Sequence, residues 1–245
     1  MFRKLVVAVV VGGLAPAPAT QACTGIQLIA KDGGVVAART LEFGIDLRSD
    51  VLVVPAGARM SGSMPDGSKG IGYTTKYGMA GANGFGLPII IDGINDQGLY
   101  VGLFYFPGYA GYAQATAENR ARCLAPQEYG SWLLGNFSSV EEVKANFDKV
   151  VIVPVVVAQI KQAPPVHFVV HDRAGKTVVI EPIDGRLKIY DDPLGVMANS
   201  PTFDWHMTNL SNYINLSVLK RGAGPAVGVE AGAIRSGLGA ARASR

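Results

Sequence analysis

The chain has 245 residues, of which 49% are hydrophobic, 17% are charged and 31 are glycine. This length and apolar content fit one globular domain and exclude a disordered chain. The net charge of +3 comes from the two ends, because residues 23–220 contain 16 basic and 18 acidic side chains, which excludes an electrostatic footprint for DNA or RNA. The high glycine content predicts a turn-rich β or α+β fold.

The chain has too few cysteine and histidine residues for a fold that is held together by several disulfides or by a metal ion. The two cysteines cannot form a disulfide framework, and no Cys/His cluster has the spacing of zinc ligands. We therefore predict no metal site and no cofactor.

The first 22 residues have the pattern of a secretory signal peptide. Arg3 and Lys4 precede an apolar run at 5–15, and small residues follow at 20–22. The run is too short to cross a bilayer as a helix. Cleavage after this segment makes Cys23 the N-terminal residue of a periplasmic or secreted protein. Two alternatives stay open: a buried N-terminal strand, and a lipoprotein acylated at Cys23.

A β-hairpin is predicted directly after the signal peptide. Residues 23–31 and 34–40 are the strands, and Asp32-Gly33 is a two-residue turn between them. In that register Arg39 faces Ile26 and Glu42 faces Cys23. A cation and a carboxylate are thus expected beside the start of the first strand.

The remaining body alternates strands with a few helices. Strands are predicted at 51–55, 87–94, 99–106, 151–160, 166–171, 177–181 and 187–190, with short ones inside the loops of 56–86. Helices are predicted at 127–135, 140–150 and 203–216, the second capped by Ser139. Asn95 is expected to be a turn residue. Residues 221–245, rich in Gly, Ala and Arg, predict a disordered tail.

An N-terminal cysteine combines a nucleophile and a base in one residue. The thiol of Cys23 attacks, and the α-amine, whose ordinary pKa is about 7.7–8.0, accepts its proton. Arg39 would favour the thiolate, and Glu42 would orient the α-amine. The alternatives are a disulfide between Cys23 and Cys123, and an ordinary cross-strand ion pair between Arg39 and Glu42.

Five segments between Cys23 and about Leu219 resemble the choloylglycine hydrolase family. They are Ala22–Gly25, Ala38–Phe43, Asp92–Gly98, Gly102–Ala110 and Asn199–His206. This family contains the penicillin V acylases and the bile salt hydrolases, which are N-terminal-nucleophile hydrolases. The resemblance implies an α+β protein with the four-layer αββα fold. It also implies hydrolysis of linear amide C–N bonds through a thioester acyl-enzyme.

The resemblance gives roles to five residues. Cys23 matches the nucleophile, and Arg39 matches the arginine beside it. Glu42 stands where the family usually has Asp at the α-amine. The side chain of Asn199 and the backbone N–H of Tyr105 match the two donors of the oxyanion hole, whose individual loss typically lowers the rate about 10²–10³-fold.

The expected partner is a small N-acyl amide. Tyr105 stands where bile salt hydrolases typically have Asn and penicillin V acylases have Tyr. It favours penicillin V or N-acyl amides such as acyl-homoserine lactones over conjugated bile salts. Tyr109 and Tyr112, on a glycine-rich loop, are candidates for lining an acyl pocket. His206 is expected to stabilise the Asn199 loop, and the resemblance allows a homo-tetramer.

The resemblance stops before the family's pattern does. A Gly-Leu-Pro-Gly-Asp motif and a Ser-Arg-Phe motif with a catalytic arginine follow the Asn-Ser-Pro helix in the family, and neither is found here. The expected organisation is a signal peptide at 1–22, a truncated hydrolase domain at 23–220 and the tail at 221–245. The fold is therefore expected to be incomplete at its C-terminus, and a catalytically inactive family member stays an alternative.

Overall fold

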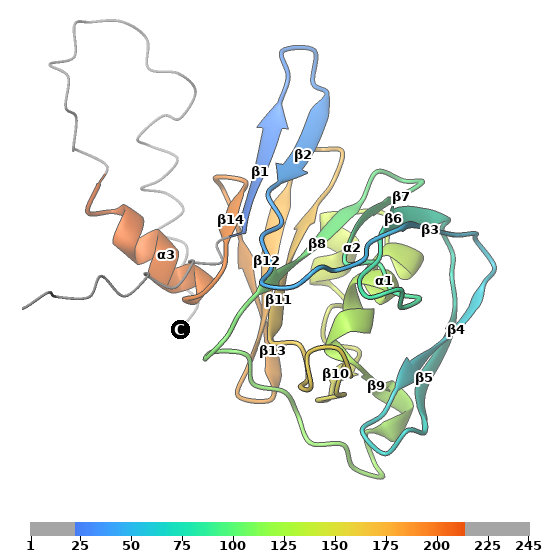
Figure 1. Cartoon of the computed structure of the whole chain (residues 1–245). Coiled ribbons are helices and arrows are strands. Elements are labelled where there is room, and N and C mark those ends of the chain that lie inside the picture. The colour runs from blue at the N-terminus through green and yellow to red at the C-terminus, as the bar shows by residue number, and fades with distance from the viewer. Residues whose placement is uncertain (1–22, 214–245) are drawn as a thin grey trace, which may run out of the picture.

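The computed structural model describes residues 23–213 (Figure 1). Its strands are β1 (Thr24–Ile29), β2 (Val35–Arg39), β3 (Val51–Val54), β4 (Arg59–Ser63), β5 (Lys69–Thr74), β6 (Met79–Ala82), β7 (Asp92–Asn95), β8 (Tyr100–Tyr105), β9 (Cys123–Leu124), β10 (Val151–Ile152), β11 (Val166–His171), β12 (Thr177–Ile183), β13 (Arg186–Asp191) and β14 (Val196–Ala198). Its helices are α1 (Tyr129–Asn136), α2 (Val140–Lys144) and α3 (Phe203–Leu210), with 3₁₀ turns η1 (Arg120–Arg122) and η2 (Pro126–Glu128). The predicted α+β class is confirmed.

The centre of the molecule is a seven-stranded antiparallel sheet. Its strand order is β13-β12-β11-β8-β7-β6-β3. A second, three-stranded sheet has the order β14-β1-β2, and two small sheets pair β4 with β5 and β9 with β10. Helix α3 lies next to β14 (Figure 1).

The two faces of the large sheet are buried against different partners. Side chains alternate between faces along a strand. On β11, Phe168 and Val170 therefore pack in the core beneath α1 and α2. Val169, between them, packs on the opposite face with Cys23 and with residues of α3. The central strands are buried on both sides, which explains why they read as apolar runs in the sequence.

The N-terminal hairpin lies on the face that carries Cys23. A Cβ on Gly25 would lie 2.7 Å from the ring of Phe104, so only glycine allows the hairpin to approach the large sheet this closely. The register of the hairpin differs from the predicted one, because Arg39 faces Gly25. Gly33, with φ of 86°, ends a three-residue turn where two residues were expected, and this shifts the pairing by one position.

Most of the other predicted elements are confirmed, and four differ. The run 151–160 forms a strand only at β10, because Pro154 removes a backbone donor. The run 87–94 pairs only from Asp92 onward, after Pro88. Helix α2 ends at Lys144 and α3 at Leu210, earlier than predicted. Strand β14 was not predicted. The predicted signal peptide and tail lie outside the described residues.

Asn95 joins the turn between β7 and β8 to helix α1, as a turn residue should. Its Nδ2 donates to the carbonyl oxygens of Leu134 (2.8 Å) and Phe137 (2.7 Å). Its Oδ1 accepts from the backbone N–H of Gln97 and of Leu99. The side chain is buried, with 4% exposure, so all four bonds form away from water.

We predict that Asn95→Ala destabilises the fold. Four hydrogen bonds are lost and two buried carbonyls are left unpaired, which should lower the free energy of unfolding by about 3 kcal/mol. Urea denaturation followed by circular dichroism measures this change. Gln97→Ala is the control, because that partly exposed side chain bonds only to Asp96. Equal midpoints for the two variants would contradict the prediction.

Candidate active site

Cys23 lies directly before β1, where the small sheet meets the large one. Its side chain is 3% exposed and packs with Phe104 and Met197. The thiol donates to the backbone oxygen of Glu42, with Sγ and O 3.6 Å apart. Cys23 also lines a cavity of about 90 Å³. A buried thiol beside a small cavity is placed to react with a molecule that enters it.

The cavity beside Cys23 is almost entirely apolar. Three loop regions and β8 supply its walls, together with Arg39 and Gln127. The remaining lining residues are Leu41, Phe43, Leu47, Gly84, Phe85, Leu87, Ile89, Ile91, Leu103, Phe104, Tyr105, Val157, Ile160, Pro164 and Val166. Such walls favour an apolar group of a ligand.

Arg39 is the charged group of this cavity. Its Nη1 donates to the backbone oxygen of Leu103 (2.6 Å) and pairs with Asp92 Oδ2 (3.2 Å). The guanidinium carbon lies 3.9 Å from the ring centre of Phe104, which is cation–π geometry. The side chain is 7% exposed, and its Nη2 is buried with no hydrogen-bond partner in the part of the chain that the structure describes. Nη2 is therefore able to donate to a bound ligand.

Asp92, the partner of Arg39, was not predicted as a site residue. Burial raises the pKa of its carboxyl, while Arg39 and the hydroxyl of Tyr100 act in the opposite direction. Tyr100 donates to Asp92 Oδ2 at 3.0 Å. A carboxylate that becomes buried needs a partner for its charge. An aspartate at the start of a predicted strand was therefore the signal in the sequence that could have identified Asp92.

Asn199 and Tyr105, the two predicted oxyanion residues, are brought together. The backbone N–H of Tyr105 donates to Asn199 Oδ1 at 3.1 Å. His206 Nε2 lies 2.9 Å from the backbone oxygen of Asn199, so this histidine holds the loop as expected. The Ser200 hydroxyl ties the same loop to Pro107. The Tyr105 N–H is thus occupied by the other predicted donor residue.

Glu42 reaches Cys23 through its main chain and not through its carboxylate. The residue is exposed, and its backbone oxygen contacts the thiol. The one-position shift of the hairpin register explains this, because Cys23 no longer faces Glu42 across the strands. The expected contact between the carboxylate and the α-amine stays a prediction.

Tyr109 and Tyr112 do not line the cavity beside Cys23. Tyr109 is 45% exposed and stacks on Phe106, with ring centres 5.5 Å apart. The hydroxyl of Tyr112 donates to the backbone oxygen of Pro164 and accepts from the N–H of Val166. Because Pro164 and Val166 line the cavity, Tyr112 supports its wall from behind.

The two cysteines form no disulfide. Both are free, and Cys123 packs in a separate cluster with Met64 and Val153. Burial raises the pKa of the Cys123 thiol, which keeps it protonated and unreactive. The disulfide alternative for Cys23 is therefore wrong in this structure.

A buried acid–imidazole pair lies behind the Asn199 loop. Glu181 Oε1 accepts from the backbone N–H of Phe203 (2.8 Å), the first residue of α3, and lies 3.2 Å from His167 Nδ1. Burial raises the pKa of Glu181 to about 8 and lowers the pKa of His167 well below 6.5. At neutral pH the pair is thus a protonated carboxyl and a neutral imidazole, and it anchors the start of α3. Glu181 was not identified from the sequence.

Comparison with known proteins places this arrangement in a family. The sequence model of the linear amide C–N hydrolases, choloylglycine hydrolase family, matches residues 23–225. The chain belongs to the choloylglycine hydrolase family. The match begins at Cys23 and includes every residue of the cavity described above.

Two relatives illustrate the degree of similarity. A bile salt hydrolase/transferase of Clostridium perfringens is 31% identical over 196 residues, which cover 79% of this chain and 58% of that protein. A penicillin V acylase of Pectobacterium atrosepticum is 27% identical over 180 residues, covering 71% of this chain and 47% of that protein. The chain therefore spans less than two thirds of these relatives.

Solved structures of the family have the same fold. A mutant conjugated bile acid hydrolase of Clostridium perfringens superposes with a TM-score of 0.70 at 30% identity, covering 84% of this chain and 64% of that one. A penicillin V acylase of Agrobacterium tumefaciens gives a TM-score of 0.67 at 26% identity, covering 80% and 58%. The predicted N-terminal-nucleophile hydrolase fold is confirmed by this likeness.

Two further properties concern only residues 23–213. No group of three or more His, Cys, Asp or Glu side chains in this range is arranged to hold a metal ion. No helix in the same range combines the length and the apolar character that a membrane span requires.

We predict a pH-dependent loss of stability that depends on Glu181. Since its pKa is 4.5 when unfolded and about 8 when folded, the folded state holds a proton that the unfolded state releases, and stability falls as pH rises between these values. The lowered pKa of His167 acts in the opposite direction only below its ordinary value of 6.5. Between pH 6.5 and pH 8 the wild type should therefore lose about 1.5 kcal/mol more than Glu181→Gln.

Urea unfolding at several pH values measures this difference. Glu141→Gln is the matched control, because Glu141 is an exposed carboxylate paired with Lys176 and should leave the slope unchanged. The same slope in the wild type and in Glu181→Gln would overturn the assignment.

Proposed function

We propose that the chain is an exported cysteine amidohydrolase that cleaves linear amide C–N bonds, with Cys23 as its N-terminal nucleophile. The observation that carries this proposal is the position of the buried Cys23 thiol on the wall of an apolar cavity that also contains Arg39 and Tyr105. Membership of a family of linear amide hydrolases supports it. A cysteine at this position supplies both the thiol and, after processing, the α-amine that accepts its proton.

In the proposed reaction the α-amine takes the thiol proton, and Cys23 Sγ attacks the carbonyl carbon of the amide. The carbonyl oxygen becomes an oxyanion and takes the place of Asn199 Oδ1 at the Tyr105 N–H. The amide side chain of Asn199 is the second donor. The C–N bond breaks, the amine leaves with the proton held by the α-amine, and a thioester remains. Water, deprotonated by the α-amine, then hydrolyses the thioester.

Arg39 contributes charge to this reaction. Its guanidinium stands on the same cavity wall as Cys23, and a nearby cation lowers the free energy of a thiolate. We propose this role for Arg39, and we keep the carboxylate of Glu42 as the group that orients the α-amine once Cys23 is the first residue.

The proposed substrates are penicillin V or other N-acyl amides such as acyl-homoserine lactones, in preference to conjugated bile salts. The apolar wall fits an apolar acyl group. The rings of Tyr105 and Phe43 make an edge-to-face contact with their centres 5.6 Å apart, and both rings line the cavity. The names of the relatives include both bile salt hydrolases and a penicillin V acylase, so both classes belong in the test.

We also propose export to the periplasm or the medium. The basic start, the short apolar run and the small residues before Cys23 support it, and the family match starts at Cys23. Acylation of Cys23 in a lipoprotein would block the α-amine. Intact-mass analysis of the purified protein separates the two outcomes, because only cleavage without acylation leaves a free N-terminal Cys23. A tetramer stays a prediction.

One alternative has an observation in its favour. An inactive family member is consistent with the backbone N–H of Tyr105 being occupied by Asn199 Oδ1. Complete absence of turnover across a panel of N-acyl amides, by protein whose mass shows a free N-terminal Cys23, would support this alternative.

We predict that Cys23→Ser abolishes amide hydrolysis. Loss of the nucleophile should lower kcat/KM at least about 10³-fold, because the hydroxyl is far less acidic than the thiol. The measurement is release of phenoxyacetate or fatty acid from a panel of N-acyl amides. Cys123→Ser is the matched control, since Cys123 is also a buried free cysteine but lies outside the cavity. Activity that survives in Cys23→Ser, or is lost equally in the control, would refute the mechanism.

A further inference from the structure

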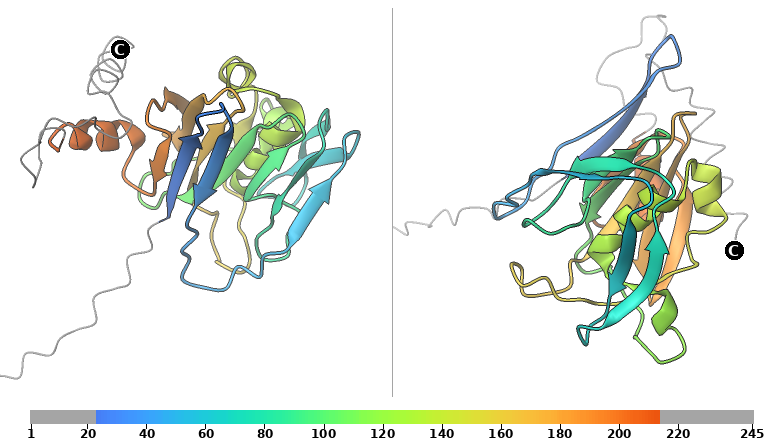
Figure 2. Two further views of the ribbon diagram at one scale, coloured as in Figure 1. Left: turned by 90° about the horizontal axis from the view of Figure 1, so that it is seen from above. Right: turned by 90° about the vertical axis from the view of Figure 1, so that its right-hand side faces the viewer.

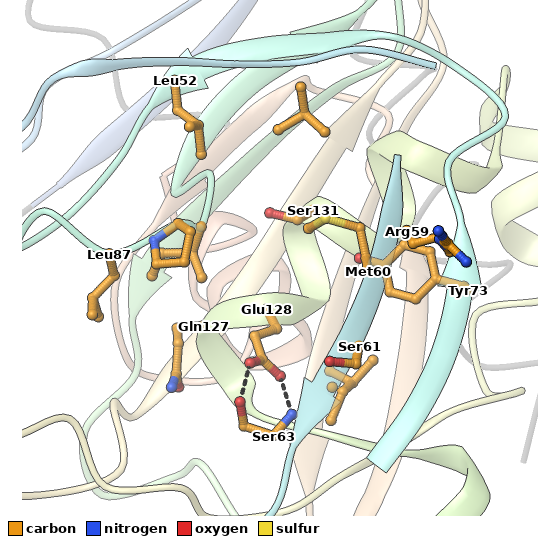
Figure 3. A pocket seen from close by; sticks show the side chains of 15 residues that line it. Leu52, Arg59, Met60, Ser61, Ser63, Tyr73, Leu87, Gln127, Glu128 and Ser131 are labelled. Carbon is orange, nitrogen blue, oxygen red and sulfur yellow. Dashed lines mark hydrogen bonds between the residues drawn. The ribbon is translucent and has the colours of Figure 1, made fainter. Parts of the chain in front are cut away.

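A second and larger cavity lies beneath the β4–β5 hairpin. Its volume is about 410 Å³, and it does not contain Cys23 (Figure 3). The hairpin supplies Met60, Ser61 and Tyr73, and the opposite wall comes from η2 and the start of α1. The walls combine apolar side chains with several hydroxyl and amide groups, which suits a ligand that is mainly apolar but carries some polar atoms.

The two cavities adjoin across a thin partition. Leu87, Ile89 and Gln127 line both of them. Figure 3 shows Leu87 and Gln127 on one side of the larger cavity, away from Tyr73. These three side chains therefore belong to the boundary between the two cavities.

The side-chain oxygen of Gln127, a residue of this partition, has no hydrogen-bond partner in residues 23–213. The residue is 8% exposed, and its Oε1 is buried with no hydrogen-bond donor among the described residues. The neighbouring carboxylate differs in this respect. Glu128 accepts from the N–H and the hydroxyl of Ser63 and from the N–H of Ala125. Because buried acceptors are nearly always paired, the free Oε1 of Gln127 points to a donor on a ligand.

The cavity beside Cys23 is too small for a large acyl group. An apolar cavity of about 150 Å³ in another protein holds one benzene molecule. The cavity beside Cys23 measures about 90 Å³, so it accepts only the first part of a long chain. The adjoining cavity of about 410 Å³ provides the remaining space.

We propose that the cavity beneath β4 and β5 binds the far end of the substrate's acyl group, and that the chain carries a hydroxyl that donates to Gln127 Oε1 where it crosses between the two cavities. The inference rests on the proposed function. It deepens that function by naming the substrate class as long-chain N-acyl amides hydroxylated between the carbonyl and the far end of the chain. The reacting carbonyl lies at Cys23, and the chain passes between Leu87, Ile89 and Gln127.

Filling the second cavity tests the proposal. Ser61 lines the cavity and faces Gly72, next to which there is open space, so a larger side chain at position 61 has room within the hairpin. Ser61→Trp should lower kcat/KM for a tetradecanoyl amide at least tenfold and leave the butanoyl amide of the same amine within twofold. Lys69→Trp is the matched control, because Lys69 lies exposed on the same hairpin and does not line the cavity.

A binding measurement separates this proposal from the proposed function. In the Cys23→Ala background no turnover occurs, so calorimetry with tetradecanoyl amides reports affinity alone. Ser61→Trp should weaken binding at least tenfold, and Gln127→Leu should remove the preference for a chain hydroxylated between its carbonyl and its far end. Equal loss of affinity for short and long chains in Ser61→Trp would overturn the inference. The absence of any preference for the hydroxylated chain in the Cys23→Ala protein that retains Gln127 would also overturn it. Tight binding without turnover by the wild type would overturn only the proposed function.

Discussion

The buried guanidinium of Arg39 holds the site together, because it joins the N-terminal hairpin to the large sheet. One nitrogen reaches the backbone of β8 at Leu103 and the carboxylate of Asp92 on β7. The planar cation also stacks on Phe104. Removing such a buried cation would leave Asp92 without its charged partner, which is the costly way to break an ion pair. The position of Cys23 on the large sheet depends on these contacts.

The same contacts limit what Arg39 can do for the reaction. Nη1 is committed to Leu103 and Asp92, and Nη2 is buried without a hydrogen-bond partner among the described residues. Asp92 would normally cancel much of the positive charge. Burial raises the pKa of the Asp92 carboxyl, and Arg39 and the hydroxyl of Tyr100 act against this shift. The role of Arg39 that the contacts show is to hold Leu103, Asp92 and Phe104 together.

Sequence reasoning found the elements whose signal is local and missed those that depend on tertiary structure. The apolar strands β11 and β12 and the helix α1 follow from periodicity and length. The hairpin register failed because Asp32-Gly33 fits a turn of two residues or of three. The resemblance supplied Asn199 and Tyr105, but no pattern could show that they bind each other. Glu181 was missed because its partners, His167 and the backbone N–H of Phe203, lie on other elements and no local sequence pattern links them to it.

The N-terminal hairpin is secured at one end, and this is the end that carries the chemistry. Cys23 is 3% exposed, whereas Leu28 and Ile29, near the turn, are 58% and 62% exposed. The turn end projects beyond the large sheet (Figure 2). Apolar burial therefore falls steadily along β1, and the hydrophobic contribution to holding the hairpin falls with it. Two features of the adjoining hairpin hold the Cys23 thiol in place. Gly25 packs closely against the ring of Phe104, and Arg39 pairs with Gly25 from the neighbouring strand.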